Sequence, residues 1–510
     1  MCSFLVIGSL LLGTDKGHQI LPRLLPWRRR PGERPAFGTV AQGRITCSCW
    51  PRIVILCPGS DQSGASRTCG AGANLHSPRQ TCRGALAGAP SKAVAIQLGV
   101  FRVYNAVFIQ GFPGLTLMAK IASVDAVVAG GGMVGAAAAL ALAQAGFRVL
   151  VLERTPPVDG AANDGVPDLR VSAFSCASVA WLRRLGAWDR IAADRVAPYR
   201  RLETWEWEDA RVSFDAGALK LPELGFMVEN HRVQRALWQA GEEQDTLTVR
   251  CPAQLAACRY DGGQWHLTLD DGQTVAARLL VGADGAHSQV RRQAGIGVSG
   301  WQYRQSCLLM TVECRTDAGD TTWQKFTPDG PRAFLPLYGQ WASLVWYDHA
   351  ARIRQLQALP LPALEREALR AFPARLGDVR LCAAGAFALT RCHAERYVAP
   401  GLALVGDAAH TINPLAGQGA NLGFRDAEAL ADVLISARDH AEPWDETRIL
   451  KRYQHRRHTD NLLMQSGMDL FYGVFSNSLP PLRLARNLGL MMAQRAGALK
   501  TQALKYALGL

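Results

Sequence analysis

Short apolar runs alternate with stretches of helical spacing in the central part of this chain. Residues 124–129 are almost wholly apolar, a glycine-rich turn follows, and small apolar residues continue to about residue 144 before a second apolar run at 148–152. This order predicts a strand, a helix and a second strand. The alternation continues to about residue 190, as a doubly wound α/β sheet requires.

The turn after the first predicted strand has the spacing G-x-G-x-x-G. Gly130 allows a tight turn, Gly132 lets a pyrophosphate approach the backbone, and Gly135 lets the helix pack closely on the sheet. Glu153 ends the second strand, 18 residues after Gly135, where its carboxylate can accept the ribose hydroxyls of an adenosine. Together these residues predict a dinucleotide site. A glycine-rich turn needed only for packing is the alternative.

Two later apolar strands also end in acidic turns. Asp284 and Gly285 follow the first of them, and Asp407 follows the second. The carboxylate of Asp407 can accept sugar hydroxyls, and Gly417 and Gly419 leave backbone N–H groups bare at a helix start, which attracts negative charge. Taken alone, each of these segments is also a common surface turn.

In this order, the segments GGGMVG, GADGAHSQVR and GDAAHTINPLAGQGAN resemble the FAD-dependent aromatic hydroxylases of the para-hydroxybenzoate hydroxylase type. The resemblance implies FAD as the cofactor, NAD(P)H as the electron donor and O2 as the co-substrate. It also implies that Asp407 holds the ribityl chain or pyrophosphate and that Pro414, Gly417 and Gly419 lie against the flavin ring. The other positions that the resemblance assigns to the cofactor are Arg154, Arg170, Asp284, Gly285 and Asn421.

Three further segments, residues 198–205, 224–230 and 326–337, narrow the resemblance to the ubiquinone-biosynthesis branch of that family. Many flavoprotein hydroxylases carry Arg where this chain has Asn230, and the ubiquinone branch also has Asn there. The implied substrate is a polyprenyl methoxy-methyl-benzoquinol. The implied partners are other ubiquinone-biosynthesis proteins in a complex.

Alternating apolar and polar residues predict antiparallel strands over residues 191–230 and 296–395, which would form a substrate-domain sheet. The FAD-binding domain then comprises residues 118–190, 231–295 and 396–465, so that the substrate-domain sheet is inserted into it. Residues 466–510 are expected to form a C-terminal helical tail. The flavin site is expected where the two domains meet.

Hydroxylation of a ring C–H requires an oxidant that ordinary side chains do not supply, so a cofactor must provide it. Reduced FAD would add O2 to give a C4a-hydroperoxide, whose terminal oxygen the electron-rich quinol ring attacks. The helix start at 417–421 would favour the anionic reduced flavin, and the inserted sheet, with residues 334–336, would exclude water. No general base is identified. His410, Pro414 and Gln418 are the candidates near the ring, and a structural role is the alternative for His410.

Other functions compete with this one. The same cofactor cradle serves flavin-dependent reductases and dehydrogenases of lipid substrates, and a non-catalytic flavoprotein subunit of a biosynthetic complex is the third alternative. No cluster of His, Cys and carboxylate residues has metal-ligand spacing, so no metal is expected. The serines lie in no nucleophile elbow, which disfavours hydrolysis.

The 510 residues are 48% apolar and 19% charged, which is typical of a globular protein with a large core. The net charge of +13 is unevenly placed, because residues 1–117 carry 13 Lys and Arg against 3 Asp and Glu. The remainder is nearly balanced, so the charge does not indicate nucleic-acid binding. Residues 1–117 also hold 6 of the 13 Cys and show no sustained periodicity. We expect them to be a non-homologous extension, disordered or mis-assigned, with translation beginning at Met118.

The C-terminal segment, residues 470–510, contains five basic residues and no acidic one. Leu484, Leu488 and Met491 recur at helical spacing beside these charges. A basic amphipathic helix of this kind can lie on an anionic membrane surface, and packing of its apolar face onto the enzyme's own core is the alternative. No run of 18 or more apolar residues is present, and the other Cys are scattered. We therefore expect a cytoplasmic protein, and a peripheral position at the inner membrane is the alternative that the basic helix leaves open.

Overall fold

The computed structural model of this protein describes residues 123–157, 165–413, 417 and 419–509, all within one compact unit. The expected extension over residues 1–117, its boundary at Met118, and the site candidates Pro414 and Gln418 lie outside the described residues. The described residues hold two large sheets and one small sheet.

The first sheet carries the predicted dinucleotide-binding segment. β1 (Val124–Ala129) pairs in parallel with β2 (Val149–Leu152) on one side and β11 (Thr274–Gly282) on the other. All of β2 and the last four residues of β1 are buried, as in strands covered on both faces. The strand order is β17-β18-β11-β1-β2-β8, with β10 beside β11 and β9 beside β10. The remaining strands are β8 (Leu247–Arg250), β9 (Leu255–Asp261), β10 (Gln264–Leu269), β17 (Val398–Ala399) and β18 (Leu402–Leu404).

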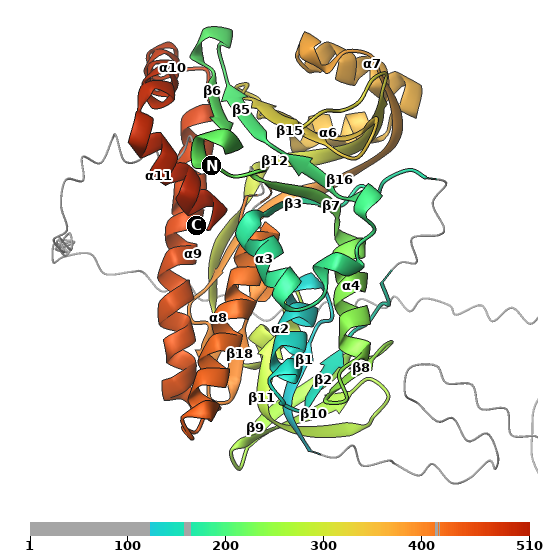
Figure 1. Cartoon of the computed structure of the whole chain (residues 1–510), viewed down its shortest axis with the longest axis vertical. Coiled ribbons are helices and arrows are strands. Elements are labelled where there is room, and N and C mark those ends of the chain that lie inside the picture. The colour runs from blue at the N-terminus through green and yellow to red at the C-terminus, as the bar shows by residue number, and fades with distance from the viewer. Residues whose placement is uncertain (1–122, 158–164, 414–416, 418, 510) are drawn as a thin grey trace, which may run out of the picture. The chain divides into compact units, whose positions relative to one another are not determined.

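Three helices pack together beside this sheet (Figure 1). α2 (Met133–Gln144) contacts both α4 (Asn230–Glu242) and α8 (Gly419–Asp439). The buried residues of α2 are Gly, Ala and Leu only, and these small side chains let α2 approach both neighbours closely. The predicted α/β fold with a Rossmann-like FAD-binding domain is confirmed.

The second sheet has eight strands in the order β19-β16-β12-β15-β14-β13-β5-β6. All neighbours are antiparallel except β13 and β5, which pair in parallel. The expected antiparallel sheet is therefore present, with one parallel pair. Its strands are β5 (Arg201–Trp205), β6 (Val212–Asp215), β12 (Val298–Cys314), β13 (Thr321–Lys325), β14 (Arg332–Pro336), β15 (Trp341–His349), β16 (Val379–Ala394) and β19 (His410–Thr411).

The two faces of the second sheet are covered differently. One face, which includes Phe334, packs under α6 (Ala350–Gln357) and α7 (Leu361–Ala371). The other face shares an apolar core with residues near the predicted flavin segment, such as Ile412. Leu335 packs against this second core. Of these two neighbouring apolar side chains, only Leu335 therefore faces the predicted cofactor side.

A small antiparallel sheet consists of β3 (Val171–Ser175), β7 (Gly225–Glu229) and β4 (Ala197–Tyr199). The strands expected over residues 191–230 therefore divide between two sheets, because β5 and β6 join the large one. β7 leads directly into α4 and so ties the small sheet to the first sheet's helices. The short helices α3 (Cys176–Arg184) and α5 (Gln289–Gln293) follow β3 and β11.

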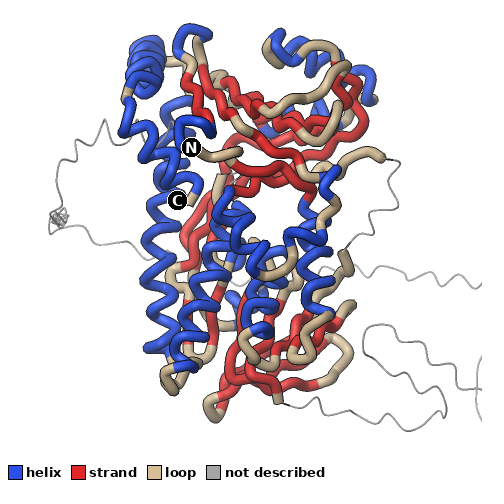
Figure 2. Tube along the Cα trace, viewed as in Figure 1, coloured by secondary structure: helices blue, strands red, loops and turns tan. Residues whose placement is uncertain are grey.

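The C-terminal part is helical, as Figure 2 shows, and consists of α9 (Thr447–Phe475), α10 (Pro480–Arg495) and α11 (Gly497–Leu508). α9 continues through position 466, where the helical tail was expected to begin. α10 begins with proline at its first position, where the missing N–H costs no hydrogen bond. Over the described ranges, no helix is long and apolar enough to cross a membrane.

Candidate functional site

The glycines of the G-x-G-x-x-G turn have separate structural roles. Gly130 has a φ of +105°, and a Cβ there would lie 2.4 Å from the carbonyl oxygen of Ala283. A Cβ on Gly135 would lie 2.0 Å from the carbonyl oxygen of Gly130. Both positions exclude a side chain because backbone passes so close to them. This is the tight turn and the close helix packing that the motif predicts.

Gly132 is different, because a Cβ there would meet nothing within 4 Å. Gly132 is the N-cap of α2, no side chain caps this helix start, and its first turn has no acidic residue. The start of α2 thus combines open space with backbone N–H groups and a positive dipole end, which is the requirement for a phosphate group. The chain's own backbone here fits a dinucleotide pyrophosphate.

Glu153 lies directly beside this turn. Its carboxylate accepts hydrogen bonds from the backbone N–H of Gly131 at 2.6 Å and of Thr155 at 3.0 Å. Two side chains of α4 hold the same turn from the other side, because Gln234 and Trp238 both donate to the Gly131 carbonyl oxygen, at 2.9 and 2.8 Å. These two residues belong to no motif, so only the fold brings them to the site. Arg154 is exposed next to Glu153.

The second predicted motif is built around Asp284. One carboxylate oxygen accepts from the backbone N–H groups of Gln289 and Val290, at 2.7 and 3.0 Å, and so holds the start of α5. The other oxygen is buried and has no hydrogen-bond partner among the described residues. Gly285 has a φ of +81° and open space around its Cα. Asp284 therefore has one oxygen committed to the protein and one that a ligand hydroxyl can satisfy.

Arg291 joins the second motif to the third. Its buried guanidinium donates to the carbonyl oxygens of Ala408 at 2.7 Å and Ala286 at 2.8 Å. Ser288 caps the same short helix by accepting from the Arg291 N–H at 2.9 Å. Ala408 follows Asp407 directly, so Arg291 fixes the turn that carries the predicted cofactor carboxylate.

Asp407 lies in the turn that follows β18. Its side chain is exposed although Gly406 and Ala408 on either side are buried. Burial among surrounding protein atoms raises the pKa of Asp407, while His410 and Arg170 lower it. An exposed carboxylate with protein atoms around it can accept the hydroxyls of a ribityl chain, as the resemblance implies. Arg170 acts on the same carboxyl electrostatically, so these two predicted residues lie together.

Asn230 adds an unsatisfied acceptor on the Arg170 side of the site. Its backbone N–H donates to the Arg170 carbonyl oxygen at 2.9 Å, while its buried Oδ1 has no partner among the described residues. Buried polar oxygens are seldom left without a donor. The hydroxyl groups of a dinucleotide such as FAD could donate hydrogen bonds to the unsatisfied oxygens of Asn230 and Asp284. The open space at Gly132 could hold its pyrophosphate.

His410 lies in the protein interior, unlike the exposed Asp407. It is buried, and its Nε2 lies against the carboxylate of Asp426, which is also fully buried. Asp426 further accepts from Arg457 at 2.8 Å, from Asn461 at 2.9 Å and from the Gly406 N–H at 3.2 Å. This network favours the structural role for His410, because His410 supports the Asp426 carboxylate, which in turn holds the Gly406 N–H.

Asn421 also acts through the protein. Its Oδ1 accepts from the Ser175 N–H at 2.9 Å and the Ser178 hydroxyl at 2.7 Å, and its Nδ2 donates to the Ala173 carbonyl oxygen at 2.7 Å. The side chain therefore fixes the start of α8 against β3 and has little left to offer a cofactor directly. The resemblance supplied its position but not this role.

The start of α8 is open at its first residues. A Cβ on Gly419 would meet nothing within 4 Å, and the first turn of this 21-residue helix has no acidic residue. Gly417 has a φ of +63° and packs against Ala173. These features fit an aromatic ring placed against a positive helix end. No group of His, Cys, Asp or Glu that could hold a metal ion is found in the part of the chain that the structure describes.

The buried Asp426 predicts how stability depends on acid. Burial raises its pKa, but His410 and Arg457 lower it further, to about 2. A depressed pKa stabilises the fold above the unfolded value of about 4, and this contribution of roughly 2 kcal/mol is lost as pH falls toward 2. We expect the difference in unfolding free energy between wild type and Asp426→Asn to shrink over that range in urea titrations. A difference that stays constant from neutral pH down to 2 would contradict the assignment.

Known proteins resemble this chain over most of its described length. The sequence profile of the FAD binding domain family matches residues 123–462. A 3-demethoxyubiquinol 3-hydroxylase of Escherichia coli (strain K12) is 61% identical over 383 residues, which are 75% of this chain and 98% of that protein. The ubiquinone hydroxylase UbiL of Rhodospirillum rubrum is 37% identical over 388 residues, 76% of this chain and 89% of that protein. Among solved structures, p-nitrophenol 4-monooxygenase PnpA of Pseudomonas putida shares the fold, with a TM-score of 0.64 and 21% identity over 75% of this chain and 96% of its own.

Proposed function

This chain belongs to the FAD-dependent hydroxylases of ubiquinone biosynthesis, and on that premise we propose that it hydroxylates the ring of a polyprenyl methoxy-methyl-benzoquinol. It is an FAD-dependent monooxygenase. One atom of O2 enters the ring C–H bond as a hydroxyl, the other leaves as water, and NAD(P)H supplies the two electrons. The proposed ring position is the one named for the E. coli relative, 3-demethoxyubiquinol 3-hydroxylase.

The single observation that carries this proposal is the 61% identity to that relative over 98% of its length. The geometry supports it independently of any name. Three motifs far apart in the sequence contribute open backbone at Gly132, the exposed carboxylate of Asp407 and the open start of α8. The helix start at Gly132 suits the pyrophosphate of FAD, and the start of α8 suits its flavin ring.

The protein's own residues are proposed to bind and orient rather than to react. Bound FAD supplies the activation of O2 that side chains cannot. Gly132 and Glu153 would hold the adenosine and pyrophosphate, Asp407 and Arg170 the ribityl part, and the start of α8 would stabilise negative charge on the ring by its dipole. The second sheet, through the apolar core that contains Leu335 and Ile412, would exclude water from the reacting ring.

Turnover with a short-tailed demethoxyquinol tests this function. We expect the purified, FAD-loaded enzyme to consume O2 and NAD(P)H together and to give a product heavier by one oxygen atom in mass spectrometry. Reduction of the substrate without O2 would instead assign a flavin-dependent reductase, the competing enzyme class. Replacing Asp407 by Ala should lower FAD content and turnover together, because we assign its carboxylate to the ribityl part of FAD.

The partners and location form the rest of the proposal. A polyprenyl quinol resides in a membrane, so we propose that the enzyme works at the cytoplasmic side of the inner membrane, with other ubiquinone-biosynthesis proteins near it. The sequence similarity to ubiquinone hydroxylases supports the quinol substrate.

A further inference from the structure

Helix α10 is apolar on two sides, because Leu490 and Ala493 are fully buried in the protein while other apolar side chains face outward. Its protein-facing side includes Arg486 and Asn487, which are 4% and 0% exposed. Its outward side carries Leu484, Leu488 and Met492, which are 50%, 48% and 58% exposed and follow one another at a spacing of four residues. Residues at this spacing form one stripe along a helix. An apolar stripe that faces away from the protein indicates an interaction surface.

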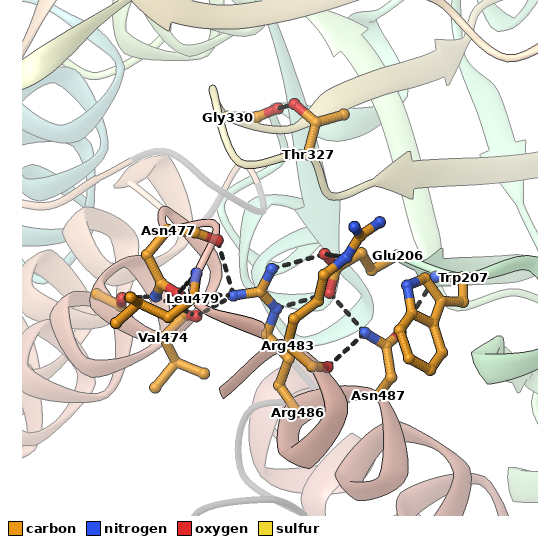
Figure 3. A network of polar contacts seen from close by, with 11 residues as sticks. Glu206, Trp207, Thr327, Gly330, Val474, Asn477, Leu479, Arg483, Arg486 and Asn487 are labelled. Carbon is orange, nitrogen blue, oxygen red and sulfur yellow. Dashed lines mark hydrogen bonds and ion pairs between the residues drawn. The ribbon is translucent and has the colours of Figure 1, made fainter. Parts of the chain in front are cut away.

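A buried ion pair fixes this orientation, as Figure 3 shows. Arg486 donates to both oxygens of Glu206, each at 2.6 Å, and both side chains are almost completely buried. Asn487 donates to the same carboxylate at 2.7 Å, and Arg483 does so at 3.0 Å. Arg486 also donates to the Val474 carbonyl oxygen at the end of α9, at 2.9 Å. These bonds prevent α10 from rolling its leucines inward, because that would leave the Glu206 carboxylate buried without a partner.

The charge of this segment complements an anionic surface. Residues 470–510 contain no Asp or Glu. Arg495 continues the stripe of Leu484, Leu488 and Met492 at the C-terminal end of α10 and is exposed, as is Lys505 on α11. Basic residues beside an exposed apolar stripe suit the interface of a bilayer with anionic headgroups. A soluble protein partner would require no such absence of acidic residues.

We propose that the α10 face, defined as Leu484, Leu488, Met492 and Arg495, docks onto the surface of an anionic lipid bilayer. The apolar side chains enter the headgroup boundary and Arg495 remains at the level of the lipid phosphates. Glu206 and Arg486 are positioning residues that present this face. The inference rests on the proposed function in one respect: docking on a bilayer would bring the enzyme to its lipid substrate.

Vesicle co-sedimentation of the full-length, FAD-loaded protein tests the proposal. The variant Leu484→Ser/Leu488→Ser/Met492→Ser is expected to bind vesicles of phosphatidylethanolamine and phosphatidylglycerol at least about tenfold more weakly than wild type. Arg495→Gln should weaken binding to these vesicles and leave binding to phosphatidylcholine vesicles unchanged. Turnover of a short-tailed, water-soluble quinol should be unaffected in all of them, because the changed side chains are on the outer side of α10.

The matched control is Leu361→Ser/Leu369→Ser on α7, where two leucines are 40% and 41% exposed far along the chain from α10. This variant should bind vesicles as wild type does. Equal loss in both variants would show that general hydrophobicity, and not the α10 face, governs binding, and so would overturn the proposal. Wild-type binding retained by the triple variant would overturn it as well.

A photo-crosslinking side chain in place of Leu488 identifies what covers the face. Adducts to lipid in the presence of the anionic vesicles support the proposal. Adducts to a second copy of the chain or to residues 1–122 would overturn it by assigning another occupant. Vesicle binding through this face without any quinol hydroxylation would sink the proposed function and leave the docking surface standing, so the two failures are distinguishable.

Discussion

A Gly132→Val variant is expected to fold normally and to lose most of its FAD. The φ and ψ of Gly132, −64° and 177°, are open to any residue, and an added Cβ would meet no atom within 4 Å. The protein alone therefore gives no reason for glycine here. A pyrophosphate at the start of α2 would give that reason, because the new side chain would occupy its space. We expect FAD affinity to fall roughly a hundredfold, measured by flavin fluorescence titration of the apoprotein.

Two further glycine variants make this result interpretable. Gly467→Val on α9 also has open space around its Cα, but Gly467 is exposed on this helix and belongs to none of the three motifs, so FAD affinity should stay as in wild type. Gly135→Val should reduce the yield of folded protein, since its Cβ would meet the Gly130 carbonyl oxygen at 2.0 Å. Normal FAD affinity in Gly132→Val would contradict the assignment of the pyrophosphate to this helix start, and with it the assignment of the adenosine to the same end of the site.

Local sequence patterns predicted the parts of the fold that depend on neighbouring residues. The first strand and the helix after it were expected at 124–129 and from the glycine turn to about 144, and β1 and α2 have these bounds. Periodicity succeeds here because a strand buried on both faces and an alanine-rich helix are both determined within a few residues. The division of residues 191–230 between two sheets was not predicted, since strand partners depend on contacts distant in sequence.

Site residues without a motif could not be predicted for the same reason. Gln234 and Trp238 hold the glycine turn from α4, and Asp426 holds the Gly406 turn from α8, yet none of them has a distinctive spacing. The one hint in the sequence is that Asp426 is an acidic residue within the buried stripe of a helix. A buried carboxylate requires a cation or several donors near it. Its partner Arg457 lies 31 residues away on α9, so the pair is visible only in the structure.

The orientation of α10 shows a further limit of sequence patterns. The spacing of Leu484 and Leu488 predicts an apolar stripe but does not say whether it faces protein or solvent. The structure leaves both residues about half exposed and buries Arg486 instead. The cause is Glu206, more than 250 residues earlier in the chain, whose carboxylate requires the arginine. A buried acid on one element thus decides which side of a distant helix faces out.

Replacing Asp426 by Ala is expected to cause the largest loss of stability of any single change at this site. The carboxylate accepts hydrogen bonds from Arg457, from His410 and from the Gly406 N–H, so its removal leaves buried donors without this acceptor and Arg457 with Asp460 as its remaining counter-ion. Removing one member of such a pair costs about 3–5 kcal/mol. Urea unfolding of the apoprotein measures this cost without interference from FAD binding.

Asp432→Ala, at an exposed position on the same helix, is the matched control and should change the unfolding free energy by less than about 0.5 kcal/mol. Equal stabilities of the two variants would mean that the Asp426 network does not support the Gly406 turn, and Asp407 would then lack the rigid backbone on which its proposed contact with FAD depends.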